Sequence, residues 1–114
     1  IALDPLIYNG TTTTCEALIM GVPVVSWIGD RHAARVGFDL LSRVGLSELA
    51  TEDRDDYVAL AASLANDLPR LQRIRGELRE RMLQSPICDP IRYARQFEAA
   101  LRQMWQEWCT QPER

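Results

Sequence analysis

Four consecutive threonines stand at residues 11–14, directly after an Asn-Gly pair and directly before an apolar, helix-like segment. Each hydroxyl group can donate a hydrogen bond. The first N–H groups of a helix have no intrahelical partner and lie at the positive end of the helix dipole, so they stabilise anions. Thr11, Thr12 and Thr13, together with these N–H groups, therefore form a candidate phosphate site.

Glu16 is the acidic residue that follows this run most closely. It stands four positions after Thr12 and three after Thr13, so on a helix it projects from nearly the same face. An acidic side chain beside a phosphate-binding turn commonly accepts hydrogen bonds from ribose hydroxyls. The pattern indicates a nucleotide site.

The same residues also have a simpler interpretation. Threonines before a helix often serve as its cap, and Glu16 in a first turn would complement the helix dipole with no ligand. Asn9 and Gly10 are interpreted as turn residues. His32 is assigned a structural role, because it stands in the first turn of a predicted helix with no evident carboxylate partner except Asp30. Arg35 could form a salt bridge within the domain or approach a bound phosphate, and the structural role is favoured.

Two apolar segments on either side of the threonine run predict buried strands. Residues 1–3 are interpreted as the end of one strand, and residues 22–28 as a second strand that is covered on both faces. The helix between them is predicted to end at Met20, with Gly21 as a left-handed cap. Two strands joined by a helix form a βαβ unit, so the sequence predicts an α/β fold.

The rest of the chain is predicted to be helical. Asp30 is predicted to cap a helix over residues 31–43, and further helices are predicted over residues 54–68, 69–84 and 90–109. The last helix carries one apolar face, formed by Ile91, Ala94, Phe97, Leu101, Met104, Trp105 and Trp108.

Composition narrows the class of protein. The 114 residues are 46% hydrophobic, enough for one domain. The net charge of −3 gives no support to nucleic-acid binding. Cys15, Cys88 and Cys109 lie far apart and the chain has a single histidine, so no metal site or disulfide framework is predicted. We expect a cytoplasmic protein without a membrane partner, since unpaired cysteines fit a reducing compartment and no apolar stretch is long enough to cross a bilayer.

The segment LDPLIYNGTTTTCEALIMGVPVV, followed by GDRHAARVG, resembles the C-terminal end of the catalytic region of protein O-linked N-acetylglucosamine transferases. The likeness includes the bacterial tetratricopeptide-linked and SPINDLY-like members. It continues through residues 60–68, the Ser-Pro pair at residue 85 and the sequence QMW at residues 103–105.

The resemblance implies an inverting transferase of the two-lobed GT-B type, whose donor UDP-N-acetylglucosamine binds mainly to a C-terminal Rossmann-like lobe. Residues 1–50 would be the end of that lobe, and residues 51–114 its C-terminal helices. In animal members of the family a His-Thr-Thr triplet holds the diphosphate, and an Asp three positions after the triplet holds the ribose. These positions correspond here to Thr11, Thr12 and Thr13, and to Glu16.

The resemblance also implies parts that lie elsewhere. A phosphate-binding lysine, the uracil loops, the N-terminal lobe and the tetratricopeptide repeats are expected upstream, and this chain contains no lysine. No metal or other cofactor is implied, and the acceptor is a Ser or Thr hydroxyl of a protein. We expect the chain to be a fragment that is inactive alone, and to associate if the last helix normally packs on the other lobe. Two alternatives stay open: a GT-B enzyme that uses another nucleotide sugar, and a non-catalytic helical interaction module.

Overall fold

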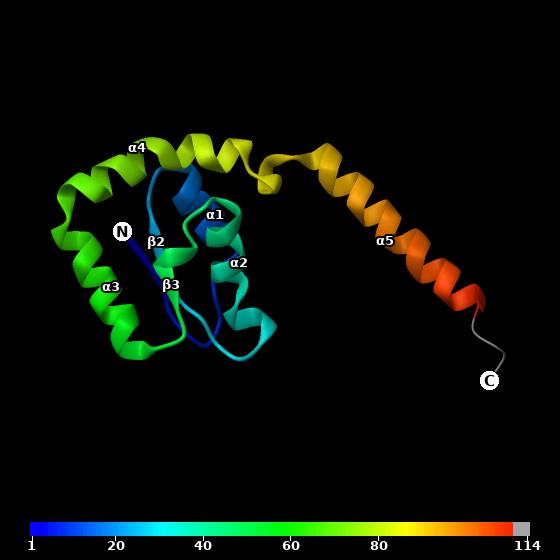
Figure 1. The fold of residues 1–114 in the computed structure, drawn as a ribbon, viewed down its shortest axis with the longest axis horizontal. Helices are drawn as coiled ribbons and strands as arrows, with labels where there is room; N and C mark the ends of the chain where they lie inside the picture. The colour runs from blue at the N-terminus through cyan, green and yellow to red at the C-terminus, as the bar shows by residue number, and fades with distance from the viewer. Residues whose placement is uncertain (111–114) are drawn as a thin grey trace.

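The structure is a computed structural model that describes residues 1–110. It consists of an α/β body and a long final helix that extends away from it (Figure 1), with overall dimensions of 61 × 30 × 18 Å. The N-terminus lies within the body, and the chain leaves the body at the end where the final helix begins.

The body contains a small parallel sheet. Strands β1 (Ala2–Asp4), β2 (Val24–Trp27) and β3 (Ala50–Thr51) lie side by side in the order β1-β2-β3. Leu3 pairs with Val25 in the register of the first two strands. The predicted α/β fold with a βαβ unit is confirmed. Strand β3 was not predicted, because two residues are too short to show a strand pattern.

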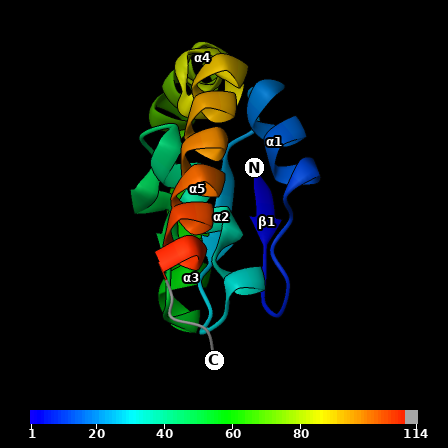
Figure 2. The same cartoon turned by 90° about the vertical axis from the view of Figure 1, so that its right-hand side faces the viewer.

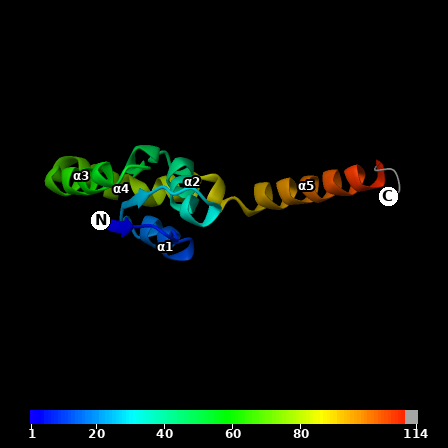
Figure 3. The same cartoon turned by 90° about the horizontal axis from the view of Figure 1, so that it is seen from below.

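Four helices belong to the body: α1 (Thr12–Ile19), α2 (Val36–Arg43), α3 (Arg54–Asn66) and α4 (Leu68–Gln84). Three single turns of 3₁₀ helix connect the elements: η1 (His32–Ala34), η2 (Ser47–Leu49) and η3 (Pro86–Cys88). Helices α1, α2 and α3 all contact β2, and α4 crosses the body to contact both α1 and α3. In Figures 2 and 3, α1 lies apart from α2 and α3, with the sheet between them.

One hydrophobic core joins the four helices of the body to the sheet. Leu18, Leu41, Leu64 and Leu78 come from four different helices, and each of these side chains is completely buried in the same cluster. Val24 and Val25 of β2 belong to this cluster as well, so the helices pack against the central strand of the sheet. The core therefore holds α1 against the central strand β2, and β1 is held in place by its pairing with β2.

The predicted helix over residues 31–43 is wrong in its first half. The chain makes only the η1 turn there, and α2 begins at Val36. The carbonyl of Ala33 accepts the N–H of Asn9, and the carbonyl of Ala34 accepts the N–H of Gly29, each at 2.8 Å. Because these carbonyls serve other parts of the chain, they do not bond the N–H groups of the next helical turn.

Asp30 does not cap a helix, which contradicts the second part of that prediction. Its carboxylate accepts a hydrogen bond from Nε of Arg31 at 3.0 Å, and this bond lowers the pKa of Asp30. Arg31 occupies the N-cap position of η1, and no side chain caps that turn.

The other helix ends agree with those predicted from the sequence. Gly21 and Gly45 follow α1 and α2 with φ angles of 72° and 71°, the left-handed conformation that favours glycine. The helices predicted over residues 54–68 and 69–84 are α3 and α4. Asp53 caps α3 by accepting the N–H groups of Asp55 and Asp56 at 2.7 and 2.9 Å.

The final helix, α5 (Pro90–Thr110), has no buried residue. It contacts η3 at its start and then projects from the body (Figures 1 and 3). Trp105 and Trp108 are 65% and 70% exposed, as expected for the chain by itself. Within residues 1–110, no helix is long and apolar enough to cross a membrane.

Candidate nucleotide site

The threonine run lies at the start of α1, beyond the carboxyl end of β1. The first hydrogen bond of the helix joins the N–H of Cys15 to the carbonyl of Thr11 at 3.0 Å. The N–H groups of residues 12–14 precede this bond, so they are the terminal donors of the helix. Thr11 is the N-cap residue, but its side chain makes no capping hydrogen bond. The capping interpretation is therefore wrong for this hydroxyl.

The structure brings the predicted site residues together on the exposed end of α1. Thr11, Thr12, Thr13 and Glu16 are exposed, whereas Thr14 is buried. Glu16 is the fifth residue of α1, and the first turn contains no acidic residue. A simple first-turn contact with the helix dipole therefore does not account for Glu16. What its side chain would bind remains a prediction.

A buried carboxylate supports the loop that leads to the site. Asp4, the last residue of β1, is 6% exposed. Its Oδ1 accepts the N–H of Gly10 at 2.8 Å, and its Oδ2 accepts the hydroxyl of Ser26 at 3.0 Å. These two bonds tie Gly10, the residue before the threonine run, to the neighbouring strand β2. The pKa of Tyr57 is raised mainly by burial and, to a lesser extent, by the negative charge of Asp4.

Asn9 is a second buried support, in addition to its position in the turn. It is 1% exposed, and its Oδ1 accepts the N–H of Gly37 in α2 at 3.3 Å. Its Nδ2 donates to the carbonyls of Pro5 and Trp27, each at 3.5 Å. The loop is thereby connected to β2 and to the start of α2.

A hollow of about 620 Å³ lies beside the threonine run. It extends from Thr11 along η1 and α2, past His32 and Arg35. Arg35 donates to the carbonyl of Gly29 at 2.9 Å and to Oε1 of Glu52 at 3.3 Å. These bonds give Arg35 the structural role predicted from the sequence.

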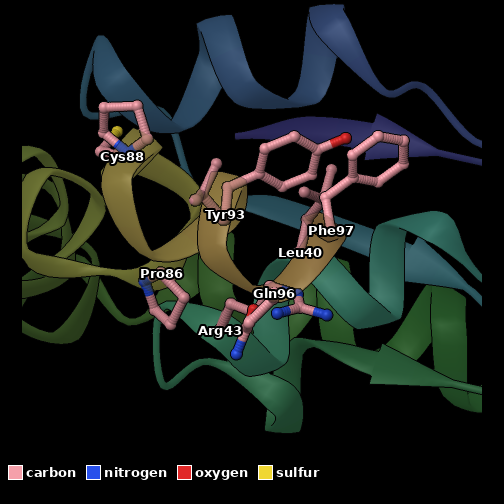
Figure 4. A pocket seen from close by; sticks show the side chains of 9 residues that line it. Leu40, Arg43, Pro86, Cys88, Tyr93, Gln96 and Phe97 are labelled. Atoms are coloured by element: carbon pink, nitrogen blue, oxygen red, sulfur yellow. The ribbon is translucent and has the colours of Figure 1, made fainter. Parts of the chain in front are cut away.

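A second hollow, of about 670 Å³, lies between α2, η3 and the first turns of α5 (Figure 4). Tyr93 and Phe97 of α5 line it together with Leu40 and Arg43 of α2. The aromatic rings of Tyr93 and Phe97 stack on each other. Arg43 forms a two-bond ion pair with Asp39 at 2.8 and 3.0 Å, which raises the pKa of Arg43. Leu40 and Arg43 line both hollows.

The cysteines and acidic residues form no metal site within the described part of the chain. All three cysteines are free thiols. Burial raises the pKa of the Cys15 thiol, and the neighbouring Cys88 and Glu16 raise it further.

Sequence reasoning missed the supporting residues Asp4 and Ser26. Both are polar residues in otherwise apolar strands, and both are buried. A polar side chain inside a buried strand needs a hydrogen-bond partner. That signal was present in the sequence, but the identity of the partner depends on how the two strands pair.

The parallel sheet, with a donor-rich helix start beyond the end of a strand, places the chain in the Rossmann-like class of α/β folds. The family model described as glycosyl transferase family 41 matches residues 1–97. The chain belongs to this family.

Two relatives illustrate the match in sequence. The SPINDLY protein of Hordeum vulgare, described as a probable UDP-N-acetylglucosamine-peptide N-acetylglucosaminyltransferase, is 49% identical over 109 residues, which are 96% of this chain and 12% of that protein. The SEC protein of Arabidopsis thaliana, with the same description, is 32% identical over 111 residues, which are 96% of this chain and 11% of that protein.

A solved structure of a Thermobaculum terrenum O-GlcNAc transferase, in a mutant with lysine replaced by methionine, has a TM-score of 0.88 to this chain. It is 39% identical, and the match covers 96% of this chain and 21% of that one. The chain thus spans only a small part of each relative, and the family resemblance found in the sequence is confirmed.

Proposed function

We propose that this chain is the C-terminal part of the donor-binding lobe of a protein O-GlcNAc transferase, which transfers N-acetylglucosamine from UDP-N-acetylglucosamine to Ser or Thr hydroxyls of an acceptor protein. Thr11, Thr12 and Thr13 bind the diphosphate, and Glu16 binds the ribose. The observation that supports this most strongly is the start of α1, where an N-cap threonine leaves its hydroxyl out of the cap beside the free N–H end of the helix. Relatives described as probable UDP-N-acetylglucosamine-peptide N-acetylglucosaminyltransferases, which are 32% to 49% identical to this chain, also support the proposal.

The proposed chemistry follows from where charge develops. In an inverting transfer the oxygen of the acceptor hydroxyl attacks the anomeric carbon, and the hydroxyl proton passes to a base that lies outside this chain. The bond from the anomeric carbon to the UDP oxygen breaks, and UDP leaves with additional negative charge. The hydroxyls of Thr12 and Thr13 and the N–H groups of α1 would stabilise this charge in the transition state.

We propose that these donors meet the leaving-group charge without a metal ion. In that case an excess of EDTA leaves the transfer rate of the complete enzyme unchanged. A loss of transfer that added Mg²⁺ or Mn²⁺ restores would contradict this part of the proposal.

The remaining parts of the enzyme lie outside this chain in the proposal. They are the N-terminal lobe, the tetratricopeptide repeats, the phosphate-binding lysine and the uracil loops. The chain alone should show no sugar transfer above buffer background. We also propose a cytoplasmic location, which the free thiols of Cys15, Cys88 and Cys109 favour.

The test of the proposal is a kinetic comparison in the complete transferase. Thr12→Ala and Thr13→Ala should each weaken donor binding and slow transfer, with a loss of about 1–3 kcal/mol of transition-state stabilisation. Ser42→Ala is the matched control, because the Ser42 hydroxyl donates to the carbonyl of Phe38 on an exposed part of α2. Unchanged kinetics in both threonine variants would refute the proposed site.

The same assay separates the two alternatives. Transfer from a GDP-sugar or from another UDP-sugar, with no transfer from UDP-N-acetylglucosamine, would indicate a GT-B enzyme with a different donor. Absence of both transfer and UDP binding in the complete wild-type protein would favour the non-catalytic interaction module.

A further inference from the structure

The carboxylate of Asp4 occupies an unusual place for a negative charge. It is buried at the end of β1, and its Oδ1 lies 2.8 Å from the N–H of Gly10, the residue directly before the threonine run. If that run binds a diphosphate, a nearby carboxylate repels the ligand. A structural role of this carboxylate must therefore offset its repulsion of the diphosphate.

The hydrogen bonds of Asp4 define that role. One oxygen holds the backbone of Gly10, and the other holds the hydroxyl of Ser26 at 3.0 Å. The carboxylate thus bridges the loop and strand β2, which belongs to the core of the body. Charged acceptors form the stronger class of hydrogen bonds to backbone N–H groups. The bridge fixes where the chain enters α1.

Two glycines show how closely the bridge is packed. A Cβ atom on Gly37 would collide with the Ser26 hydroxyl and with Oδ2 of Asp4. A Cβ atom on Gly10 would collide with the hydroxyl of Thr13 and approach that of Thr14 to 2.9 Å. The Thr13 hydroxyl therefore lies against the residue that Asp4 holds, so a displaced Gly10 would displace a proposed ligand of the diphosphate.

We propose that Asp4 is a positioning residue for the donor: by holding Gly10 against β2, its carboxylate sets the position of the Thr12 and Thr13 donors without contacting the ligand. Asn9 assists by joining the same loop to Gly37 of α2. This proposal rests on the proposed function, because the donor is the ligand being positioned.

The test measures donor KM, acceptor KM and kcat in the complete transferase, and the dissociation constant of UDP by calorimetry. Asp4→Ala should raise the donor KM and the UDP dissociation constant by about 10- to 100-fold, the loss expected when a charged acceptor of a backbone N–H is removed. The acceptor KM should stay within about threefold of wild type, since no acceptor contact is lost.

Asp4→Asn separates position from charge. Its amide oxygen can still accept the Gly10 N–H, and its NH₂ group can donate to the Ser26 hydroxyl. The variant should therefore bind UDP at least as tightly as wild type, because repulsion of the diphosphate is also removed. A rise in donor KM in Asp4→Asn comparable with that in Thr12→Ala would overturn the proposal, even if Asp4→Ala fails to fold.

Asp53→Ala is the matched control for general destabilisation. Asp53 also accepts two hydrogen bonds with its carboxylate, but from backbone groups at the start of α3. It should lower the melting temperature and leave the donor KM unchanged. An unchanged donor KM in Asp4→Ala, with Thr12→Ala impaired, would overturn the positioning role alone. Unchanged kinetics in Thr12→Ala and Thr13→Ala would instead refute the proposed function.

Discussion

The α/β body and helix α5 are built on opposite principles. In the body, each of the helices α1 to α4 contributes leucines or other apolar residues to one core. The candidate site lies on this body, at the start of α1. Helix α5 has 21 residues with a continuous apolar face, and none of them is buried. Its Phe97, Leu101 and Trp108 are 52%, 50% and 70% exposed.

An amphipathic pattern predicts a helix but does not identify the surface against which the helix packs. The pattern in α4 is satisfied within the chain, through Ile74, Leu78 and Met82. The equivalent pattern in α5 is not satisfied within the described residues. An exposed apolar face of this length is typical of an interaction surface.

The largest expected contrast comes from truncating one leucine in each region. Leu78→Ala in the body should lower the free energy of unfolding by about 2–5 kcal/mol, because the side chain is completely buried. Leu101→Ala in α5 should change it by less than about 0.5 kcal/mol in this chain. Urea denaturation followed by circular dichroism measures both values. Equal losses would show that α5 shares the core.

A smaller contrast comes from the helix caps. Asp53→Ala removes the cap of α3 and should cost about 1 kcal/mol of unfolding free energy, since α3 unfolds together with the body. Asp89→Ala removes the acceptor that the Arg92 N–H donates to at 2.9 Å, at the start of α5. It should fray α5, seen as a loss of helical circular dichroism, with no change in the unfolding midpoint of the body. A lowered midpoint in this variant would show that α5 unfolds together with the body.

The smallest contrast concerns thiol reactivity. Cys15 is half-buried in α1, whereas Cys109 is exposed in α5. Burial raises the pKa of Cys15, so its thiolate fraction at pH 8 is reduced and its alkylation by iodoacetamide should be slower than that of Cys109. Because its pKa is raised, the Cys15 rate should continue to rise at pH values where an ordinary thiol is already fully ionised. In urea the two rates should converge. Equal rates in the folded chain would show that burial does not protect the Cys15 thiol.

Much of the fold could be predicted because the signals are local. Gly21 and Gly45 mark helix ends, Pro90 follows a capping Asp89, and apolar residues recur at helical spacing in α3, α4 and α5. The helix start at the threonine run was predicted for the same reason. These features depend on neighbours a few residues apart.

The features that escaped prediction depend on distant neighbours. The first half of the helix predicted over residues 31–43 is lost because Asn9 and Gly29 take the carbonyls of Ala33 and Ala34. The bridge made by Asp4 depends on the pairing of β1 with β2, which places Asp4 opposite Ser26. No pattern within either segment specifies that pairing, so the support of the candidate site emerged only from the structure.

The proposed nucleotide site is tested most directly by hydrogen–deuterium exchange of the complete transferase with and without UDP. UDP should slow exchange in the peptide that contains residues 10–16, because the N–H groups at the start of α1 bind the diphosphate in the proposed site. Exchange in α5 should not respond. If calorimetry shows that UDP binds and the exchange of residues 10–16 does not change, the start of α1 does not hold the diphosphate and the proposed site is wrong.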